Sequence, residues 1–234
     1  PTRSTRGCVH MTDPGLIEAL RAATAPERVL GPDAAVEDYT HDECLTVEPR
    51  QPLAVVLPVS TEEVAAVVRV AATRGVAITA RGSGTGLSGA ATPAEGSIVV
   101  SFERMNAVLE LDPDNHTAVV QPGVRLNELD EVTAAAGLTY PVYPGEYSAS
   151  LGGNIATNAG GMRAVKYGVT RHQVLGLELV LADGQIIGTG GKFVKATTGY
   201  DLTQLIIGSE GTLAVVTEAI LKLHPRIDHS ATVL

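Results

Sequence analysis

Apolar and polar positions in the first hundred residues predict helices that alternate with buried strands. Segment 53–57 (LAVVL) is apolar throughout, as expected for a strand that is covered on both faces. Valines and alanines recur at helical spacing within 60–75, which begins with a Ser-Thr-Glu-Glu capping box and ends in glycine. A second strand follows at 76–80, and an earlier helix over 14–23 has Asp13 as its expected N-cap. The pattern predicts a βαβ unit behind an N-terminal helix.

From residue 97 onward the pattern predicts mostly strands. We expect short strands over 97–101, 107–111 and 117–121, a helix over 124–136, a β-hairpin over 174–190, a short helix over 201–207 and a long strand over 212–225. Segment 139–168 is predicted to be almost all loop, because it holds two prolines and six glycines. The expected fold class is α+β, with mixed sheets flanked by helices in two lobes, 11–96 and 97–225.

Composition narrows the function classes. With 44% hydrophobic and 18% charged residues, the chain is expected to fold, and a net charge of −9 with scattered Lys and Arg excludes a nucleic-acid partner. The longest apolar runs are far shorter than the ~20 residues of a membrane span. Cys8 and Cys44 have neither metal-ligand nor disulfide spacing, which indicates a reducing, cytoplasmic location. Residues 1–10 lack the apolar centre of a signal peptide, so we interpret them as an expression leader before Met11.

A glycine-rich loop follows the second strand. Gly84, Gly86 and Gly89 have the G-x-G-x-x-G spacing of a dinucleotide-binding turn. A Rossmann site requires a helix to begin there, yet only AATPAEG, with Pro93 inside it, precedes the next strand. No Gly-Lys-Ser/Thr follows, which excludes a Walker A loop. A helix-free anion cradle remains, in which Ser83, Thr85 and Ser88 add hydroxyl donors and Arg81 adds a charge at the entrance. A plain flexible surface loop is the alternative.

Two further glycine clusters contain polar or approachable backbone. Gly-Gly pairs at 152–153 and 160–161 bracket Asn154, Thr157 and Asn158, which suits a flat polar ring system lying against a backbone. A glycine-rich turn with Asx caps is the structural alternative. The third cluster, 208–211, joins the short helix to the last strand, and a purely structural turn explains it equally well.

Together these stretches resemble one family. RGSGTGLSG (81–89), SLGGNIATNAGG (150–161) with KYG, and TGYDLTQLIIGSEGTLAVVTE (198–218) are similar to the FAD-binding domain of FAD-linked oxidases. This is the vanillyl-alcohol oxidase and p-cresol methylhydroxylase (PCMH) superfamily, and the branch most similar contains glycolate oxidase, D-lactate dehydrogenase and D-2-hydroxyglutarate dehydrogenase. The resemblance covers about residues 36–225, and it implies a two-lobed PCMH-type domain with FAD between the lobes.

The resemblance also implies where FAD would bind. The pyrophosphate would lie on Arg81, Gly82, Ser83, Gly84, Thr85, Gly86, Leu87, Ser88 and Gly89. The flavin and ribityl region would lie on Pro144, Gly145, Ser150, Gly152, Gly153 and Asn154, alongside Thr157, Asn158, Gly160 and Gly161. The adenine side would meet Glu210, Gly211, Val215 and Val216. Some relatives attach FAD through a His in the pyrophosphate loop, but Thr85 occupies the matching position, so non-covalent binding is expected.

In the family the chain continues into a substrate-binding cap domain that carries the catalytic and metal-binding histidines. Here residues 226–234 are expected to be the start of that cap or a disordered tail, so no catalytic or metal residue is assigned. His41 is the best local candidate for reaching the active site, with a surface role as the alternative. His172 could approach the flavin or bond within its own loop.

Lys166 and Tyr167 could lie near the flavin ring or only cover the loop, and Cys44 is expected to be a small apolar filler. The implied function is oxidation of a 2-hydroxy acid by hydride transfer to FAD, with an electron-accepting partner. A non-catalytic FAD-binding module or accessory subunit is the alternative. Within the same fold, an enolpyruvyl reductase or an alkyl-dihydroxyacetone-phosphate synthase stays open.

Overall fold

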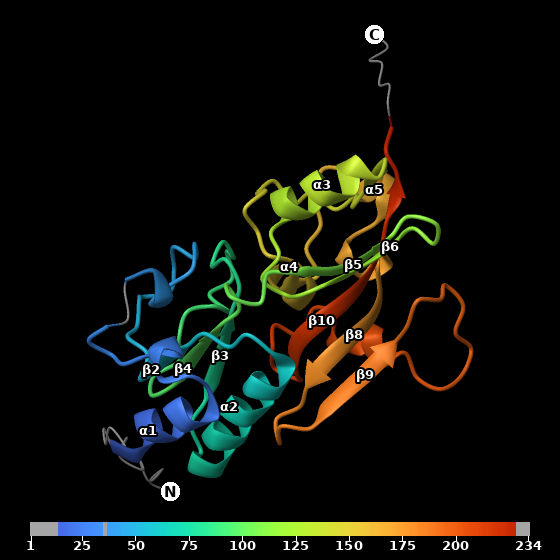
Figure 1. Ribbon diagram of the computed structural model, residues 1–234. Helices are drawn as coiled ribbons and strands as arrows, with labels where there is room; N and C mark the ends of the chain where they lie inside the picture. The colour runs from blue at the N-terminus through green and yellow to red at the C-terminus, as the bar shows by residue number, and fades with distance from the viewer. Residues whose placement is uncertain (1–13, 35–36, 228–234) are drawn as a thin grey trace, which may run out of the picture.

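The computed structural model describes residues 14–34 and 37–227. The expected leader, the N-cap Asp13 and positions 228–234 of the expected tail lie outside the described residues. Two larger sheets stand side by side, each with its own helices (Figure 1), and a two-stranded sheet accompanies the second. No helix within the described ranges is long and apolar enough to cross a membrane.

The first lobe is a four-stranded sheet with two helices packed against each other. Its strands run in the order β1 (Val29–Leu30), β2 (Ala54–Val56), β4 (Ile98–Ser101) and β3 (Ile78–Arg81). The last three are parallel, and only β1 is antiparallel to its neighbour. Helices α1 (Pro14–Ala23) and α2 (Thr61–Arg74) lie side by side in Figure 1.

The predicted N-cap of α2 is confirmed, but the reciprocal half of the capping box differs, because the Glu63 carboxylate accepts from the Val59 N–H at 3.0 Å. The Ser60 hydroxyl accepts a hydrogen bond from the Glu63 N–H at 3.3 Å, and Gly75 ends the helix in the left-handed region at φ 63°. The predicted βαβ unit is present, although β2 and β3 do not pair directly with each other. Strand β4 lies between them, so the first sheet extends to Ser101, past the boundary expected at 96–97.

The second lobe is a five-stranded antiparallel sheet. Its order is β5 (Val108–Asp112), β6 (Thr117–Val120), β10 (Val215–Lys222), β8 (Val174–Val180) and β9 (Ile186–Gly190). A two-stranded sheet of β7 (Leu138–Thr139) and β11 (His224–Pro225) lies next to α3 (Leu126–Ala135). The predicted hairpin, the 124–136 helix and the last strand are confirmed with shorter bounds, as is a short helix, α6 (Leu202–Ile206).

The prediction that 139–168 is almost all loop is wrong. The segment contains α4 (Leu151–Thr157) and a helical turn, α5 (Ala164–Tyr167). The two glycines inside α4 disfavour a helix locally, but packing reverses that preference. A Cβ on Gly152 would lie 2.6 Å from the Cβ of Pro122, so only glycine lets the helix approach the strand connection so closely.

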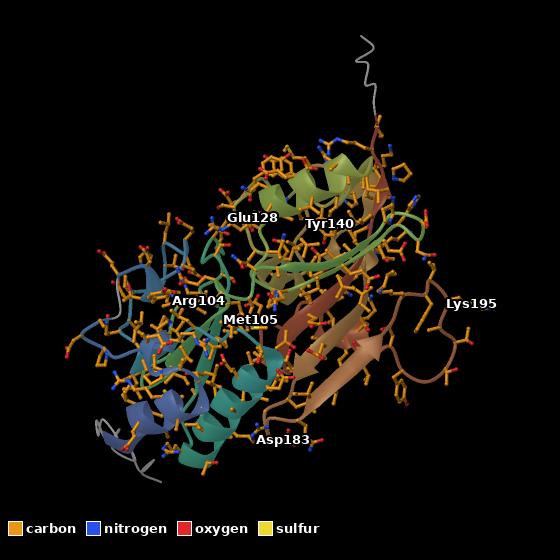
Figure 2. The ribbon with its side chains drawn as sticks, viewed as in Figure 1. Arg104, Met105, Glu128, Tyr140, Asp183 and Lys195 are labelled. Atoms are coloured by element: carbon orange, nitrogen blue, oxygen red, sulfur yellow. The ribbon has the colours of Figure 1, made fainter. Side chains whose placement is uncertain are left out.

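The lobes are joined through a shared carboxylate and a shared core. Glu178 on β8 accepts hydrogen bonds from the Thr61 hydroxyl at 2.5 Å and from the Thr217 hydroxyl at 3.1 Å. Val180, also on β8, is buried within the apolar cluster of the first lobe. Figure 2 shows Met105 between the two lobes, where it is 1% exposed. The lobes therefore form one packed body.

Candidate cofactor-binding cleft

One large cleft is lined by three segments that are far apart in the sequence. These are the loop after β3, the segment around α4, and the turn that leads into β10. The cleft volume is about 1160 Å³, somewhat above the ~300–1,000 Å³ typical of small-molecule sites. The three glycine clusters of the sequence therefore meet around a space suited to a large ligand.

The loop over 82–96 is held in place by a buried carboxylate. Asp42, which is 4% exposed, accepts hydrogen bonds from the Cys44 N–H at 3.1 Å and the Ala91 N–H at 3.2 Å. The Thr92 hydroxyl lies 3.4 Å from the same carboxylate, and the Glu43 N–H donates to the Gly86 carbonyl at 2.9 Å. These bonds fix the loop against 42–44, unlike a plain flexible surface loop.

Arg81 supports this loop from beneath. The sequence suggested a charge at the loop entrance, but the side chain is 7% exposed, and its guanidinium donates to the His41 carbonyl at 2.5 Å. The guanidinium also lies 5.9 Å from the centre of the Tyr39 ring. Burial lowers the pKa of this guanidinium, although an arginine stays charged in proteins. A positive charge is therefore buried under the loop backbone.

The backbone of this loop has spare hydrogen-bond donors. Among the described residues, the N–H groups of 84–89 have no hydrogen-bond partner within the protein. Leu87 and Ser88 are exposed and the other four residues are half-buried, and N–H groups that are shielded from water are almost always paired in folded proteins. A run of unpaired N–H groups in a loop is a site for an anion.

Serines tie the loop to the second lobe. The Ser83 N–H donates to the Ser150 hydroxyl at 3.2 Å, and the Ser83 hydroxyl donates to the Ser148 carbonyl at 2.7 Å. Ser150 also caps α4, where it accepts from the Gly153 N–H at 3.4 Å. The hydroxyl proton of Ser83 is thus used within the protein, which leaves the backbone as the main donor surface of the loop.

Two buried polar atoms at the cleft have no partner among the described residues. They are Nδ2 of Asn154, on α4, and Oγ of Ser209, in the turn before β10. That turn is docked on α4, since the Glu210 N–H donates to the Ala156 carbonyl at 2.9 Å. An unpaired buried polar atom is costly unless something else bonds it, so both atoms mark places for ligand groups.

The cleft glycines serve two different purposes. A Cβ on Gly82 would lie 2.0 Å from Oγ of Ser150, and one on Gly84 would lie 2.1 Å from the Arg81 guanidinium. By contrast, a Cβ on Gly86 would meet only an Asp42 oxygen at 3.6 Å, and one on Gly145 would meet nothing within 4 Å. Gly82 and Gly84 are therefore needed for internal packing, whereas Gly86 and Gly145 keep open space.

Of the predicted cofactor residues, all but Gly89 and Gly161 line this cleft. A Cβ on Gly89 would lie 2.8 Å from Val47, and one on Gly161 would lie 1.7 Å from the Tyr143 carbonyl oxygen. These two glycines therefore allow close packing behind the cleft walls. Contact of the lining residues with FAD stays a prediction.

Several further residues line the cleft for which the sequence predicted no cofactor contact, some of them inside the stretches that carry the family resemblance. They are Asp42, Glu43, Leu45, Ala80, Ala90, Ala91, Phe102, Pro122, Glu146, Ala149, Ala156, Ala159, Ile206, Ser209 and Ala214. Most are small or apolar and carry no chemical signal of their own. Asp42 and Glu43 come from a segment about 40 positions before the loop, and no spacing in the chain connects the two.

The candidate histidines, like Cys44, do not line the cleft. His41 contributes only its backbone carbonyl to Arg81, while His172 accepts from the Val169 N–H at 3.1 Å within its own loop. Cys44 is half-buried with its sulfur near Gly89, and a hydrogen bond from the Thr46 hydroxyl lowers the pKa of the thiol. Lys166 and Tyr167 line a different pocket.

The cleft wall carries few chemically reactive side chains. Within the described ranges, no His, Cys or Tyr lines it, and no group of three or more His, Cys, Asp or Glu side chains could hold a metal ion. Its polar surface consists of backbone, hydroxyl and amide groups with a few carboxylates around one buried arginine. Such a wall can bind and orient a ligand.

Comparison with known proteins identifies the family to which this chain belongs. A family described as an FAD-binding domain matches residues 52–190. The chain is 64% identical over 202 residues to an uncharacterised FAD-linked oxidoreductase of Mycobacterium tuberculosis, covering 86% of this chain and 44% of that protein. It is 44% identical to the glycolate oxidase subunit GlcD of Bacillus subtilis, covering 93% and 46%.

The D-lactate dehydrogenase of Archaeoglobus fulgidus is 50% identical, over 74% of this chain and 39% of that protein. Among solved structures, an alkyldihydroxyacetonephosphate synthase superposes with a TM-score of 0.80 at 27% identity, covering 91% and 40%. The chain thus spans somewhat less than half the length of these relatives. It belongs to the FAD-linked oxidoreductase family, as a PCMH-type FAD-binding domain.

Proposed function

We propose that the cleft holds FAD without a covalent bond, in a protein that oxidises a 2-hydroxy acid. The observation that carries this proposal is the run of unpaired N–H groups at 84–89, at the edge of a cleft large enough for a dinucleotide. These donors suit the pyrophosphate, which is the most highly charged part of FAD. The buried charge of Arg81 adds a favourable field from below.

The rest of the cleft fits the remaining parts of the cofactor. Gly152, Gly153 and Asn154 on α4 would face the flavin and ribityl region, where the unpaired Asn154 amide needs an acceptor. The turn at 208–211 and the start of β10 would face the adenine side, where Ser209 has its unpaired hydroxyl. Both orphaned groups would gain hydrogen bonds from a polar ligand, which supports the assignment.

The side chains of the cleft support non-covalent attachment. A covalent flavin link requires a nucleophilic side chain such as His, Cys or Tyr, and none of these lines the described cleft. Thr85, in the pyrophosphate loop, carries only a weakly nucleophilic hydroxyl. Acid precipitation is therefore expected to release all flavin into the supernatant, and yellow colour in the washed pellet would contradict the proposal.

When bound, FAD supplies the hydride acceptor, and this chain binds and orients it. The substrate class is proposed from the relatives, whose names include glycolate oxidase and D-lactate dehydrogenase. The similarity to an alkyldihydroxyacetonephosphate synthase keeps a synthase of that kind as a second candidate. A non-catalytic module that acts with a partner is a further alternative. The cytoplasmic location stays a prediction from cysteine usage.

A substrate test separates these functions. The protein is expressed from its complete reading frame, loaded with FAD, and mixed under anaerobic conditions with glycolate, D-lactate or D-2-hydroxyglutarate. Oxidation of the substrate reduces the flavin, so at least one compound is expected to bleach its visible absorption, while L-lactate serves as the stereochemical control. A flavin-loaded protein that no 2-hydroxy acid bleaches would refute the substrate class but not FAD binding.

A further inference from the structure

A second pocket lies behind the cleft wall, between α3, the strand β7 and α5. Its volume is about 410 Å³, within the range of small-molecule sites. Four of the six tyrosines in the chain line it, namely Tyr140, Tyr143, Tyr147 and Tyr167, and we call it the tyrosine pocket. Figure 2 shows Tyr140 below α3. Aromatic walls of this kind favour a ligand with a flat apolar part.

The tyrosines are arranged in contact with one another and with a cation. The rings of Tyr143 and Tyr147 stack with centroids 4.2 Å apart. The ammonium of Lys166 lies 4.9 Å from the centre of the Tyr167 ring. Tyr140 is 6% exposed, and burial raises the pKa of its phenol far above the physiological range, so the ring is a neutral wall.

Positive charge at this pocket is not balanced. Arg226 is paired with Asp130, by two hydrogen bonds of 3.0 and 3.4 Å. Arg163 and Lys166 also line the pocket, three positions apart on one helical turn, and neither side chain has an ion-pair partner among the described residues. The chain as a whole has a net charge of −9, so this local excess of two positive charges is a distinct feature.

The tyrosine pocket is separate from the cofactor cleft. Tyr143 and Tyr147 line the pocket, whereas Pro144, Gly145 and Glu146 between them line the cleft. A single stretch of backbone thus forms the wall between the two spaces. It is held in place by close packing of the Tyr143 carbonyl against Gly161.

We propose that the tyrosine pocket binds a small organic anion with a flat apolar part, such as an aromatic carboxylate. Arg163 and Lys166 meet the carboxylate, and the tyrosine rings cover the apolar part. The site is distinct from the proposed FAD site and does not depend on it. Its ligand is distinguished from inorganic anions by the aromatic walls and from neutral aromatics by the two cations.

The test uses benzoate as the probe and follows its binding by isothermal titration and by changes in ligand NMR signals. Exchanging both cations in Arg163→Gln and Lys166→Gln is expected to weaken benzoate binding by at least about tenfold, since each tenfold loss corresponds to about 1.4 kcal/mol. The matched control exchanges Arg104 and Lys195 for Gln. Both are exposed and away from the pocket, with Lys195 on the loop after β9 in Figure 2.

Saturating FAD separates the two sites. Benzoate binding is expected to persist when FAD is present, and inorganic phosphate at the same concentration is expected not to displace it. Loss of binding with FAD would place the probe in the cleft and overturn the proposal. Equal displacement by phosphate, equal weakening in the control variant, or no benzoate binding to the wild type would overturn it as well.

Discussion

The two glycine-rich segments that line adjoining parts of the cleft reach their fixed shapes by different means. The loop over 82–96 has no regular secondary structure and is held by side chains beneath it, chiefly the carboxylate of Asp42. The segment over 143–161 is held by a short helix and by backbone packed on backbone, as at Gly161. The first arrangement leaves backbone N–H groups unpaired, whereas the helix uses its own.

Because of this difference, the two walls offer different groups to a ligand. A loop fixed from below can present consecutive donors to an anion without a helix, which a Rossmann site would need. A helix packed through its glycines presents a smooth face with side-chain amides, as at Asn154. The comparison predicts that removing the Asp42 carboxylate damages the first wall, and that a methyl group added at Gly161 damages the second wall.

The largest expected effect follows removal of the Asp42 carboxylate. Asp42→Ala leaves two backbone donors and the Thr92 hydroxyl without their buried acceptor, so we expect a loss of about 3 kcal/mol in the free energy of unfolding. Urea denaturation measures it, with the exposed Asp33→Ala as control. A loss no greater than that of the control would mean that the carboxylate does not hold the loop.

The second wall is tested by adding one methyl group. In Gly161→Ala, the new Cβ would lie 1.7 Å from the Tyr143 carbonyl oxygen, and the backbone must move to relieve this, at a cost of about 2 kcal/mol. Gly188→Ala is the matched control, because its Cβ meets nothing within 4 Å. The melting temperatures of the two variants are compared by thermal unfolding. Equal melting temperatures would show that the wall is not packed as described.

A change that should spare the fold comes next. Gly86→Ala adds a methyl group where only Asp42 is near, at 3.6 Å, so stability should stay within about 0.5 kcal/mol of the wild type. The methyl group would narrow the proposed pyrophosphate site and weaken FAD binding, measured by flavin fluorescence. Gly84→Ala is a poor substitute, because its φ of 75° and its contact with Arg81 make the substitution strained. Unchanged FAD affinity in Gly86→Ala would place the pyrophosphate elsewhere.

The smallest expected effect concerns pH. Hydrogen bonds from the Ser148 backbone N–H, at 2.7 Å, and from the Ser148 hydroxyl hold the pKa of Glu146 below its ordinary value. A carboxylate whose pKa is lower in the folded state than in the unfolded state stabilises the folded protein at pH values above the unfolded-state pKa. This stabilisation is lost as the pH falls through the folded-state pKa. Glu146→Gln should therefore lower the melting temperature slightly at pH 7 and not at pH 3. A difference in melting temperature between Glu146→Gln and the wild type that grows as the pH falls would contradict this prediction.

Much of this architecture could be predicted from the sequence, because local rules govern it. The Ser60 N-cap of α2, the hairpin over 174–190 and the absence of a helix after Gly89 all follow from a few neighbouring residues. Helix α4 could not be predicted in the same way, since its glycines are favourable only through packing against Pro122. The position of β4 between β2 and β3 likewise depends on tertiary pairing.

The cleft, too, could be predicted only in part from the sequence. Its glycine clusters were evident as patterns, and they meet as predicted. The side chains that hold these clusters in place were not evident, because Asp42 has no distinguishing feature in the sequence and gains its role only when folding places it under the loop. Arg81 was expected at the loop entrance, and it lies instead beneath the loop, where Tyr39 and the His41 carbonyl surround it.

Amide hydrogen exchange of the loop, with and without FAD, tests the central claim most directly. The N–H groups of 84–89 have no partner within the described protein, so they should exchange fast in the free chain and slowly once FAD is bound. The α4 amides, which are already bonded within the helix, should change less. Bound FAD that leaves 84–89 as fast as in the free protein would contradict the cradle.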